Sequence, residues 1–191
     1  CIRDRGTVSI GSVDIRQMES RYLMEQVSFV FQDVYLFKQS IRDNIRLGNQ
    51  NASDEQIQAA AKAAQCHDFI MALPNGYDTV IGEQGIHLSG GEQQRIAIAR
   101  AIVKDAPVIV LDEATAFADP ENEHLIQKAF EKLMQGKTVI IIAHRLTTVR
   151  CADNIVVIDK GKVAETGTHS QLYEAGGPYF RLWNEQFAMF E

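Results

Sequence analysis

Three short and almost entirely apolar runs, separated by stretches of helical periodicity, constrain the fold of this chain more than any other feature. The runs are VSFVFQ at residues 27–32, PVIVLDE at residues 107–113 and TVIIIAH at residues 138–144. Runs that are apolar at every position predict strands buried on both faces. Helices are predicted between them, one at about residues 54–73 and others from about residues 90 and 120. Alternating strands and helices predict an α/β fold class, a mostly parallel sheet with flanking helices.

Hairpins and short helices are predicted around this alternation. Residues 6–15 form a predicted hairpin that turns at Gly11–Ser12, and residues 154–167 form a second that turns at Asp159–Gly161. Residues 169–187 supply predicted closing helices. The chain has 191 residues, 46% of them hydrophobic, and no internal repeat or Gly/Ser-rich linker. This composition favours one domain, with two domains as the alternative.

A polar side chain follows each predicted strand where the apolar run ends. Gln32 follows the first strand, Asp112 and Glu113 follow the second, and His144 follows the third. In an open parallel sheet the carboxyl ends of the strands share one edge, and ligands bind in the crevice there. One polar residue at a strand end can simply face solvent, but four at the same edge favour a functional site. We therefore expect these four side chains to converge.

The two neighbouring carboxylates after the second strand can take different roles. Successive side chains on a strand point to opposite faces, so Asp112 and Glu113 project in opposite directions. One carboxylate can hold Mg²⁺ while the other orients or deprotonates an attacking water, and phosphoryl transfer to water requires both functions. The prediction is Asp112 as the metal ligand and Glu113 as the general base.

The helix predicted from about residue 90 begins with two glycines, in the stretch LSGGEQQR. Each glycine costs about 1 kcal/mol relative to alanine inside a helix. A helix N-terminus offers unpaired N–H groups and partial positive charge, so Gly90 and Gly91 would let a phosphate approach the backbone, with the Ser89 hydroxyl as a further donor. Ser89 and Glu92 also match a capping box, which explains these two polar residues without a ligand but leaves the glycines unexplained.

Charge and cysteine content narrow the classes of protein further. The net charge of −6 gives no global positive field that would attract nucleic acid or anionic lipid. The cysteines, at positions 1, 66 and 151, lack metal-ligand spacing and fit a reducing compartment. No apolar run approaches the roughly 18 residues that a bilayer requires. The chain starts at Cys1 without a secretory signal, which indicates a piece of a longer protein.

Across residues 6 to about 170, the order of these motifs resembles the ATP-binding cassette (ABC) ATPases. By resemblance, Gln32 belongs to the Q-loop, Leu88 to Glu92 form the signature motif, and Val108 to Asp112 form the Walker B strand. Glu113 is then the catalytic glutamate, Asp119 belongs to the D-loop, and His144 is the switch histidine. Residues 79–85, TVIGEQG, are similar to the segment with which exporter-type cassettes touch their transmembrane partner. The resemblance therefore implies an exporter.

Two positions depart from the family pattern. Glu92 stands where glutamine is the more familiar residue, and Ala118 stands where leucine is usual. Neither departure removes a catalytic group. Asp119 followed by Pro120 also makes an ordinary helix N-cap with proline at the first helical position, so a structural role for Asp119 stays open.

The phosphate-binding loop of the family is not found in this sequence. A P-loop reads G-x-x-x-x-G-K-[ST] between a strand and a helix. The stretch Gly136–Thr138 does not qualify, because Glu131 stands at the first glycine position and a strand follows. In the family this loop precedes the position of Gly6. We therefore expect residues 1–191 to be a partial ABC-type ATPase domain that binds ATP poorly, with a helical signature-motif subdomain at about residues 40–105 and the catalytic α/β core and C-terminal hairpin and helices in the remainder.

The resemblance implies that this domain is the ATPase motor of a membrane exporter, with ATP and Mg²⁺ as cofactors. In the family, ATP joins two cassettes head to tail, and the signature helix of one faces the γ-phosphate held by the other. By resemblance, Gln32 links Mg²⁺ to the membrane-coupling region, Glu113 activates water and His144 steadies the γ-phosphate. The implied partners are a second nucleotide-binding domain and transmembrane domains, with no nucleic acid, at the cytoplasmic face of the cell membrane.

Two other functions stay open. A non-transport cassette, as in DNA repair or translation factors, would need long coiled-coil heptads or a strongly basic face, and the sequence has neither. A regulatory cassette that does not hydrolyse ATP is favoured by the missing P-loop and disfavoured by the presence of Glu113 and His144. The transported substrate cannot be read from this chain, because its selectivity belongs to transmembrane segments.

Overall fold

The computed structural model describes residues 6–82, 86–112, 120–143 and 146–188. The chain divides into two compact units, Cys1–Ile140 and Ile141–Glu191. The elements of the chain up to the third long strand are β1 (Ser9–Ile10), β2 (Val13–Asp14), η1 (Ile15–Gln17), α1 (Ser20–Gln26), β3 (Val27–Val30), α2 (Ile41–Arg46), α3 (Asp54–Ala63), α4 (His67–Ala72), η2 (Gly76–Asp78), α5 (Gly90–Lys104), β4 (Val108–Asp112), α6 (Pro120–Met134) and β5 (Thr138–Ile142). The remaining elements are η3 (Leu146–Val149), β6 (Ile155–Asp159), β7 (Lys162–Gly167), α7 (His169–Glu174) and α8 (Pro178–Ala188).

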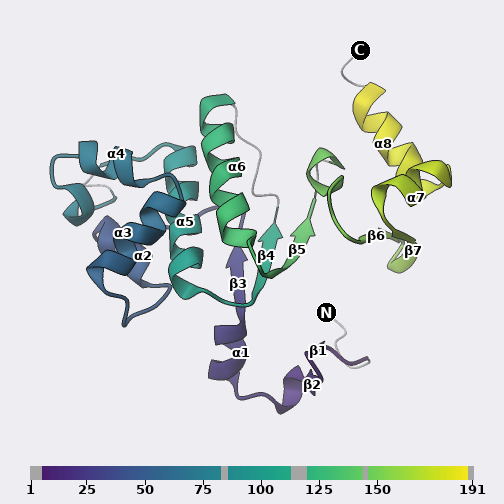
Figure 1. The fold of residues 1–191 in the computed structure, drawn as a ribbon, viewed down its shortest axis with the longest axis horizontal. Helices are drawn as coiled ribbons and strands as arrows, with labels where there is room; N and C mark the ends of the chain where they lie inside the picture. The colour runs from purple at the N-terminus through teal and green to yellow at the C-terminus, as the bar shows by residue number, and fades with distance from the viewer. Residues whose placement is uncertain (1–5, 83–85, 113–119, 144–145, 189–191) are drawn as a thin grey trace. The chain divides into compact units, whose positions relative to one another are not determined.

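The three predicted strands form one sheet in the order β3-β4-β5. β3 and β4 run parallel, with Val27 opposite Val108 and Val30 opposite Leu111, and the three arrows point the same way in Figure 1. Since α5 lies between β3 and β4 in the chain and α6 lies between β4 and β5, helical crossovers connect the strands. The predicted α/β class and the parallel pairing are therefore confirmed.

This sheet is buried on one face only. The buried side chains of its first two strands share one face, and they are Ser28, Val30, Ile109 and Leu111. Phe29 on the other face of β3 is 47% exposed, and Ile140 and Ile142 in β5 are 52% and 50% exposed. The prediction of strands buried on both faces is therefore wrong for the part of the chain that the structure describes. Helix α5 packs against β3, and the buried side chains gather on one face while Phe29 on the other face stays exposed.

Helix α5 lies at the centre of the first unit. It packs against α2, α3 and α6 as well as β3, as Figure 1 shows for the helices around it. Isoleucines from four helices fill this core with essentially no exposed surface, namely Ile41, Ile45, Ile57, Ile96, Ile98 and Ile126. The predicted starts of α5 at Gly90 and of α6 at Pro120 are confirmed.

The prediction of one continuous helix over residues 54–73 is wrong. The structure has α3 and α4 there, separated at Gln65, whose φ is +56°. The Cys66 N–H donates to the Ala61 carbonyl at 2.9 Å, which closes α3 in a tight turn. A residue in the left-handed region ends a helix because the next N–H can no longer follow the helical path. The predicted capping box at Ser53 and Gln56 is confirmed.

The second unit, residues 141–191, has its own small core. Val149, Ile155, Leu172 and Tyr179 are buried together there, and Trp183 packs against them. The predicted hairpin is confirmed as β6 and β7, which pair antiparallel across a turn with positive φ at Lys160 and Gly161. Two consecutive positive φ values match the right-handed twist of the flanking strands. The predicted closing helices are confirmed as α7 and α8.

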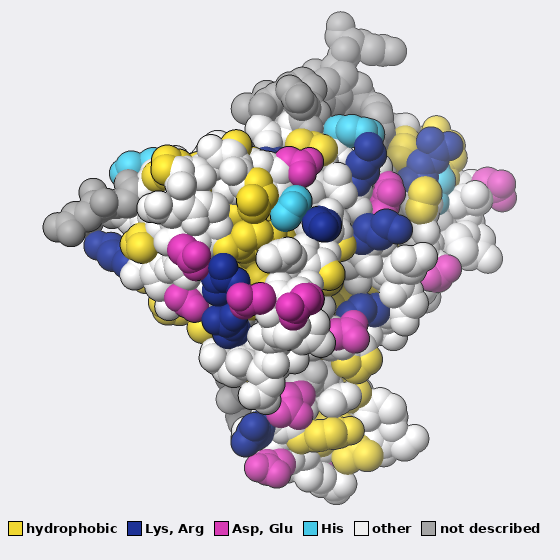
Figure 2. Space-filling view, turned by 60° about the vertical axis from the view of Figure 1, so that its left-hand side comes forward, with side chains coloured by type: hydrophobic (Ala, Val, Ile, Leu, Met, Phe, Trp, Pro, Cys, Tyr) yellow, Lys and Arg dark blue, Asp and Glu magenta, His cyan; other side chains and the backbone are white. Residues whose placement is uncertain are grey.

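The N-terminal hairpin is confirmed as β1 and β2, which pair antiparallel. Helix α1 follows it and was not predicted from the sequence. Figure 2 shows apolar side chains at the surface of the lower part of the view, where Figure 1 places these elements; Val13, Tyr22 and Met24 are 45%, 53% and 57% exposed. Within the described ranges, every helix is too short or too polar to cross a bilayer.

Candidate functional site

The N-terminus of α5 is closed by a reciprocal set of hydrogen bonds. The Ser89 backbone N–H donates to Glu92 Oε2 at 2.8 Å, and the Ser89 hydroxyl donates to the same oxygen at 2.9 Å. The Glu92 N–H donates back to Ser89 Oγ at 3.3 Å. The capping box is therefore formed. Both Ser89 and Gly90 are exposed, so the capped helix start is accessible from solvent.

The second glycine of this motif has a packing role. Gly91 is buried, and a Cβ atom there would lie 2.9 Å from both Cγ and Oδ1 of Asn122 on α6. Asn122 Oδ1 in turn accepts a hydrogen bond from Arg95 Nη1 at 2.5 Å. Leu88, just before the cap, is buried, and its carbonyl accepts a bond from Gln93 Nε2 at 2.8 Å. The close approach of α5 to α6 therefore gives a reason for Gly91 that sequence reasoning did not supply.

Gln32 and Asp112 lie at one edge of the sheet. In the parallel pairing of β3 with β4, Val30 lies opposite Leu111, so Asp112 ends its strand beside the point where the chain leaves β3 toward Gln32. Asp112 is half-buried and Gln32 is exposed. The structure thus brings the ends of these two strands together, and the convergence of the four predicted side chains stays a prediction. The other predicted site residues, Glu113, Asp119 and His144, lie outside the described residues.

The chemistry of this edge suits a hard cation. The Asp112 carboxylate and the Gln32 side-chain amide offer oxygen donors, which Mg²⁺ prefers. The described residues contain no cluster of three or more His, Cys, Asp or Glu side chains that could hold a metal ion. Mg²⁺ is commonly bound through one or two carboxylates and completes its shell with water and phosphate oxygens. The residues present therefore fit Mg²⁺ bound together with a phosphate ligand.

Two residues that sequence reasoning missed hold the segment after Gln32. Asn44 on α2 is completely buried, and Arg100 on α5 donates from Nε to the Asn44 carbonyl at 2.9 Å. Arg100 Nη1 donates to the Tyr35 carbonyl at 3.3 Å. Burial lowers the pKa of the Arg100 guanidinium from its usual value. The signal in the sequence is an arginine within the otherwise apolar run IAIARAIV, because a charge in such a position requires partners.

The same segment continues into a surface with exposed apolar side chains. Residues 38–41 lie beside residues 79–82, since Ser40 pairs with Val80 and a Cβ at Gly82 would lie 3.0 Å from Lys38 Cγ. Tyr35, Phe37 and Val80 are 69%, 46% and 52% exposed. Tyr35 and Phe37 contact each other edge to face, with ring centroids 5.0 Å apart. The segment after Gln32 and part of the predicted partner segment at residues 79–85 therefore lie side by side.

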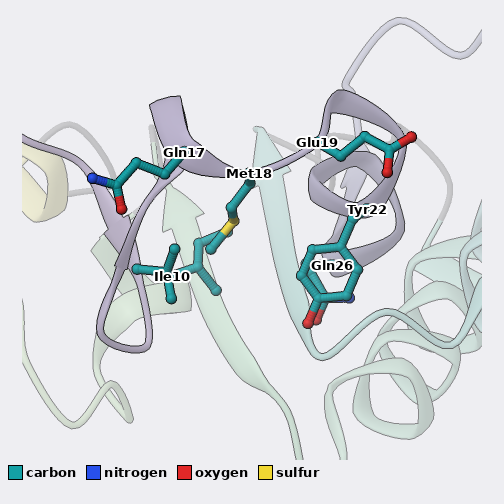
Figure 3. A pocket seen from close by; sticks show the side chains of 7 residues that line it. Ile10, Gln17, Met18, Glu19, Tyr22 and Gln26 are labelled. Carbon is teal, nitrogen blue, oxygen red and sulfur yellow. The ribbon is translucent and has the colours of Figure 1, made fainter.

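A shallow cavity of about 420 Å³ lies elsewhere in the first unit, between the N-terminal hairpin and α1. Figure 3 shows Ile10 and Met18 on one side of it and Tyr22 and Gln26 on the other. The lining is complete with Val13, Gln17 and Glu19. None of the predicted site residues belongs to this lining, so the cavity is separate from the sheet edge described above.

Comparison with known proteins gives the family of this fold. The family model described as ABC transporter matches residues 2–116. The chain is 52% identical over 183 residues to the ATP-dependent lipid A-core flippase of Acinetobacter baylyi, covering 95% of this chain and 32% of that protein. It is also 52% identical over 180 residues to the mycobactin import ATP-binding/permease protein IrtA of Mycolicibacterium smegmatis, covering 94% of this chain and 21% of that protein.

A solved structure is similar over nearly the whole chain. It is a bacterial Atm1-family ABC exporter with ATP bound, with a TM-score of 0.87 and 42% sequence identity, and the match covers 95% of this chain and 32% of the exporter. The chain thus spans about a third or less of the length of these proteins.

Proposed function

Since this chain belongs to the ABC transporter family, we propose that it is the ATP-hydrolysing motor part of a membrane exporter. The observation that carries this proposal is the parallel pairing of β3 with β4, because it brings Asp112 and the chain leading to Gln32 to one edge of the sheet. That arrangement is what a site for Mg²⁺ and phosphate requires. The similarity to a flippase, to an import protein and to an exporter of known structure supports a role in transport.

The proposed reaction is hydrolysis of the terminal phosphate of ATP. Asp112 and Gln32 would hold Mg²⁺, which when bound offsets the charge on the phosphate oxygens. Glu113, which follows Asp112 directly, takes the proton of the attacking water, and His144 stabilises the γ-phosphate. Asp119, at the D-loop position of the family, is the remaining residue of the proposed catalytic set. Residues 108–112 form the strand that ends in Asp112.

The signature helix α5 is proposed to serve a nucleotide held by a second nucleotide-binding domain. Its N-terminus is exposed at Ser89 and Gly90, and a helix of 15 residues carries partial positive charge there. Glu92 holds the Ser89 hydroxyl in place through the capping box. Leu88 and Gly91 are buried and fix the helix start by packing. Helices α2 to α5 belong to the helical subdomain that we propose at about residues 40–105.

The transmembrane domains are proposed to dock on the surface formed by Tyr35, Phe37 and Val80. These exposed apolar side chains come from the segment after Gln32 and from the neighbouring residues 79–82. A partner bound there would contact the chain close to the proposed magnesium site. The proposed location is the cytoplasmic face of the cell membrane, as part of a membrane protein.

Replacement of Glu113 in the intact protein that contains this chain tests the proposal. Glu113→Gln keeps the size of the side chain and removes the base, so we expect ATP binding to persist while turnover falls by roughly 10²-fold or more. Glu131→Gln is the matched control, because Glu131 is an exposed residue of α6 that is not among the proposed site residues. Steady-state ATPase assays and nucleotide titration measure the two quantities. Near-normal turnover in Glu113→Gln would remove Glu113 from the role of base, and no turnover in the unmodified protein would favour a regulatory cassette.

A further inference from the structure

The backbone after Gln32 is held by a buried amide although its side chains are exposed. Asn44 Oδ1 accepts from the Phe37 N–H at 2.9 Å, and Asn44 Nδ2 donates to the Phe37 carbonyl at 3.0 Å. Nδ2 also donates to the Ser40 carbonyl at 3.0 Å. One side chain thus binds both polar backbone groups of Phe37, as a neighbouring strand would. The Phe37 ring itself remains 46% exposed.

Arg100 binds this amide and the same segment from the opposite side. Its Nη2 donates to Asn44 Oδ1 at 3.2 Å, in addition to the bonds from Nε to the Asn44 carbonyl and from Nη1 to the Tyr35 carbonyl. With these bonds the Asn44 amide uses both of its N–H groups and both acceptor positions of its oxygen. Among the described residues Arg100 has no ion pair with a carboxylate. Its charge is therefore balanced by amide and carbonyl oxygens of the segment that it holds.

One face of α5 binds both ends of the segment that carries Gln32, from Val27 to Tyr35. Lys104, one helical turn after Arg100, donates from Nζ to the Val27 carbonyl at 2.7 Å, at the start of β3. Arg100 holds the Tyr35 carbonyl, three residues after Gln32. Residues i and i+4 lie on the same side of a helix. Helix α5 is therefore hydrogen-bonded to the chain on both sides of Gln32.

We propose that Arg100 and Asn44 form a polar clamp that couples the position of the Gln32 segment to that of the signature helix, which makes Arg100 a positioning residue for ATP hydrolysis. The inference rests on the proposed ATPase function and deepens it. Arg100 lies 11 residues after Ser89, about 16 Å along the helix axis, so the clamp acts on the site without touching the nucleotide. It joins the proposed membrane-docking surface at Tyr35 and Phe37 to the helix that faces the second cassette.

Hydrogen–deuterium exchange on the intact protein tests the clamp itself. In Arg100→Lys the planar fork is lost, because the single ammonium nitrogen cannot reach the three acceptors that Nε, Nη1 and Nη2 bind from separate positions. We expect the Phe37 amide, which is protected by Asn44, to exchange about 10-fold faster or more, with amides of α3 unchanged. Arg42→Lys is the matched control. Arg42 lies on α2, as Asn44 does, and binds Asp54 and Asp78 instead of the clamp, so Phe37 should keep its protection there.

Kinetics in lipid vesicles test the positioning role. We expect Arg100→Lys to lower kcat for ATP roughly 10-fold or more, the scale of a small misplacement in an active site, with KM for ATP within about twofold of the unmodified protein. Arg42→Lys should leave both near normal. If Arg100→Lys does not fold, Asn44→Ala replaces it, because this change removes the oxygen that accepts the Phe37 N–H together with both donors of the amide.

Each outcome decides the inference or the proposed function separately. Unchanged Phe37 exchange in a folded clamp variant overturns the clamp, and so does an equal acceleration at every amide, which indicates general destabilisation. Faster exchange at Phe37 with normal kcat overturns the positioning role. An unmodified protein that does not hydrolyse ATP overturns the proposed function, while the exchange experiment still decides the clamp.

Discussion

Replacement of Gly48 by alanine is predicted to destabilise the protein more than a glycine replacement at a position with positive φ. Gly48 follows α2, and its φ lies outside the left-handed region, so its backbone conformation accepts an alanine. The added Cβ would lie 2.1 Å from the Arg100 carbonyl oxygen, 3.1 Å from the Arg100 carbonyl carbon and 3.2 Å from the Lys104 nitrogen. An ordinary contact is about 3.5 Å, so the end of α2 must move from α5 by about 1.4 Å.

The magnitude follows from the kind of atoms involved. All three neighbours belong to the backbone of α5, so no side chain can rotate away. Overpacking of a filled core costs typically 1 to 3 kcal/mol, and a backbone contact this short belongs at the upper end or beyond, about 3 kcal/mol or more. For a chain of this length, each kcal/mol lowers Tm by about 2 to 4 °C, which gives a decrease of about 6 to 12 °C or more.

Gly136→Ala is the matched control. Gly136 has a φ of +73° and no atom within 4 Å of an added Cβ, so only the backbone penalty of about 1 kcal/mol applies. Thermal unfolding followed by circular dichroism measures both variants. Conformational preference alone predicts the larger loss at Gly136, whereas packing predicts it at Gly48. An equal or smaller loss at Gly48 would refute the close contact between α2 and α5.

Two further predictions concern burial. Ile109→Ala, at a position with no exposed surface, should lose about 2 to 5 kcal/mol of unfolding free energy. Ile140→Ala, at a position that is 52% exposed, should lose less than half as much; equal losses in urea denaturation would contradict the exposure of Ile140. Burial raises the pKa of the Tyr77 hydroxyl to about 12, above about 10 in the unfolded chain, so its contribution to stability is complete below about pH 10 and is lost as the pH rises through about 12. Tyr77→Phe should reduce this loss of stability at alkaline pH. Part of the loss should remain, because burial also raises the pKa of the Cys66 thiol to about 12. An unchanged dependence of Tm on alkaline pH would contradict the burial of the Tyr77 hydroxyl.

Prediction from the sequence succeeded where the determinants are local. The capping boxes at Ser53 and Ser89 need only a serine and a polar residue three positions later, and both formed. The start of α6 at Pro120 follows from the fixed φ of proline. No glycine or proline interrupts residues 54–73, and the sequence predicted one helix there. In the structure Gln65 is in the left-handed region, which separates α3 from α4.

The sequence by itself determined the three long strands, the starts of α3, α5 and α6, the order of the motifs and the family, because these depend on residue types at short and regular spacings. Only the tertiary structure decided which groups meet. Arg100 binds Asn44 from 56 residues away, and the Asn122 side chain on α6 lies 2.9 Å from where a Cβ at Gly91 on α5 would be. The tertiary structure also decided which apolar side chains of the strands are exposed, namely Phe29, Ile140 and Ile142. Contacts and exposure of this kind depend on how helices pack against a sheet, and the periodicity of a single segment does not specify its neighbours.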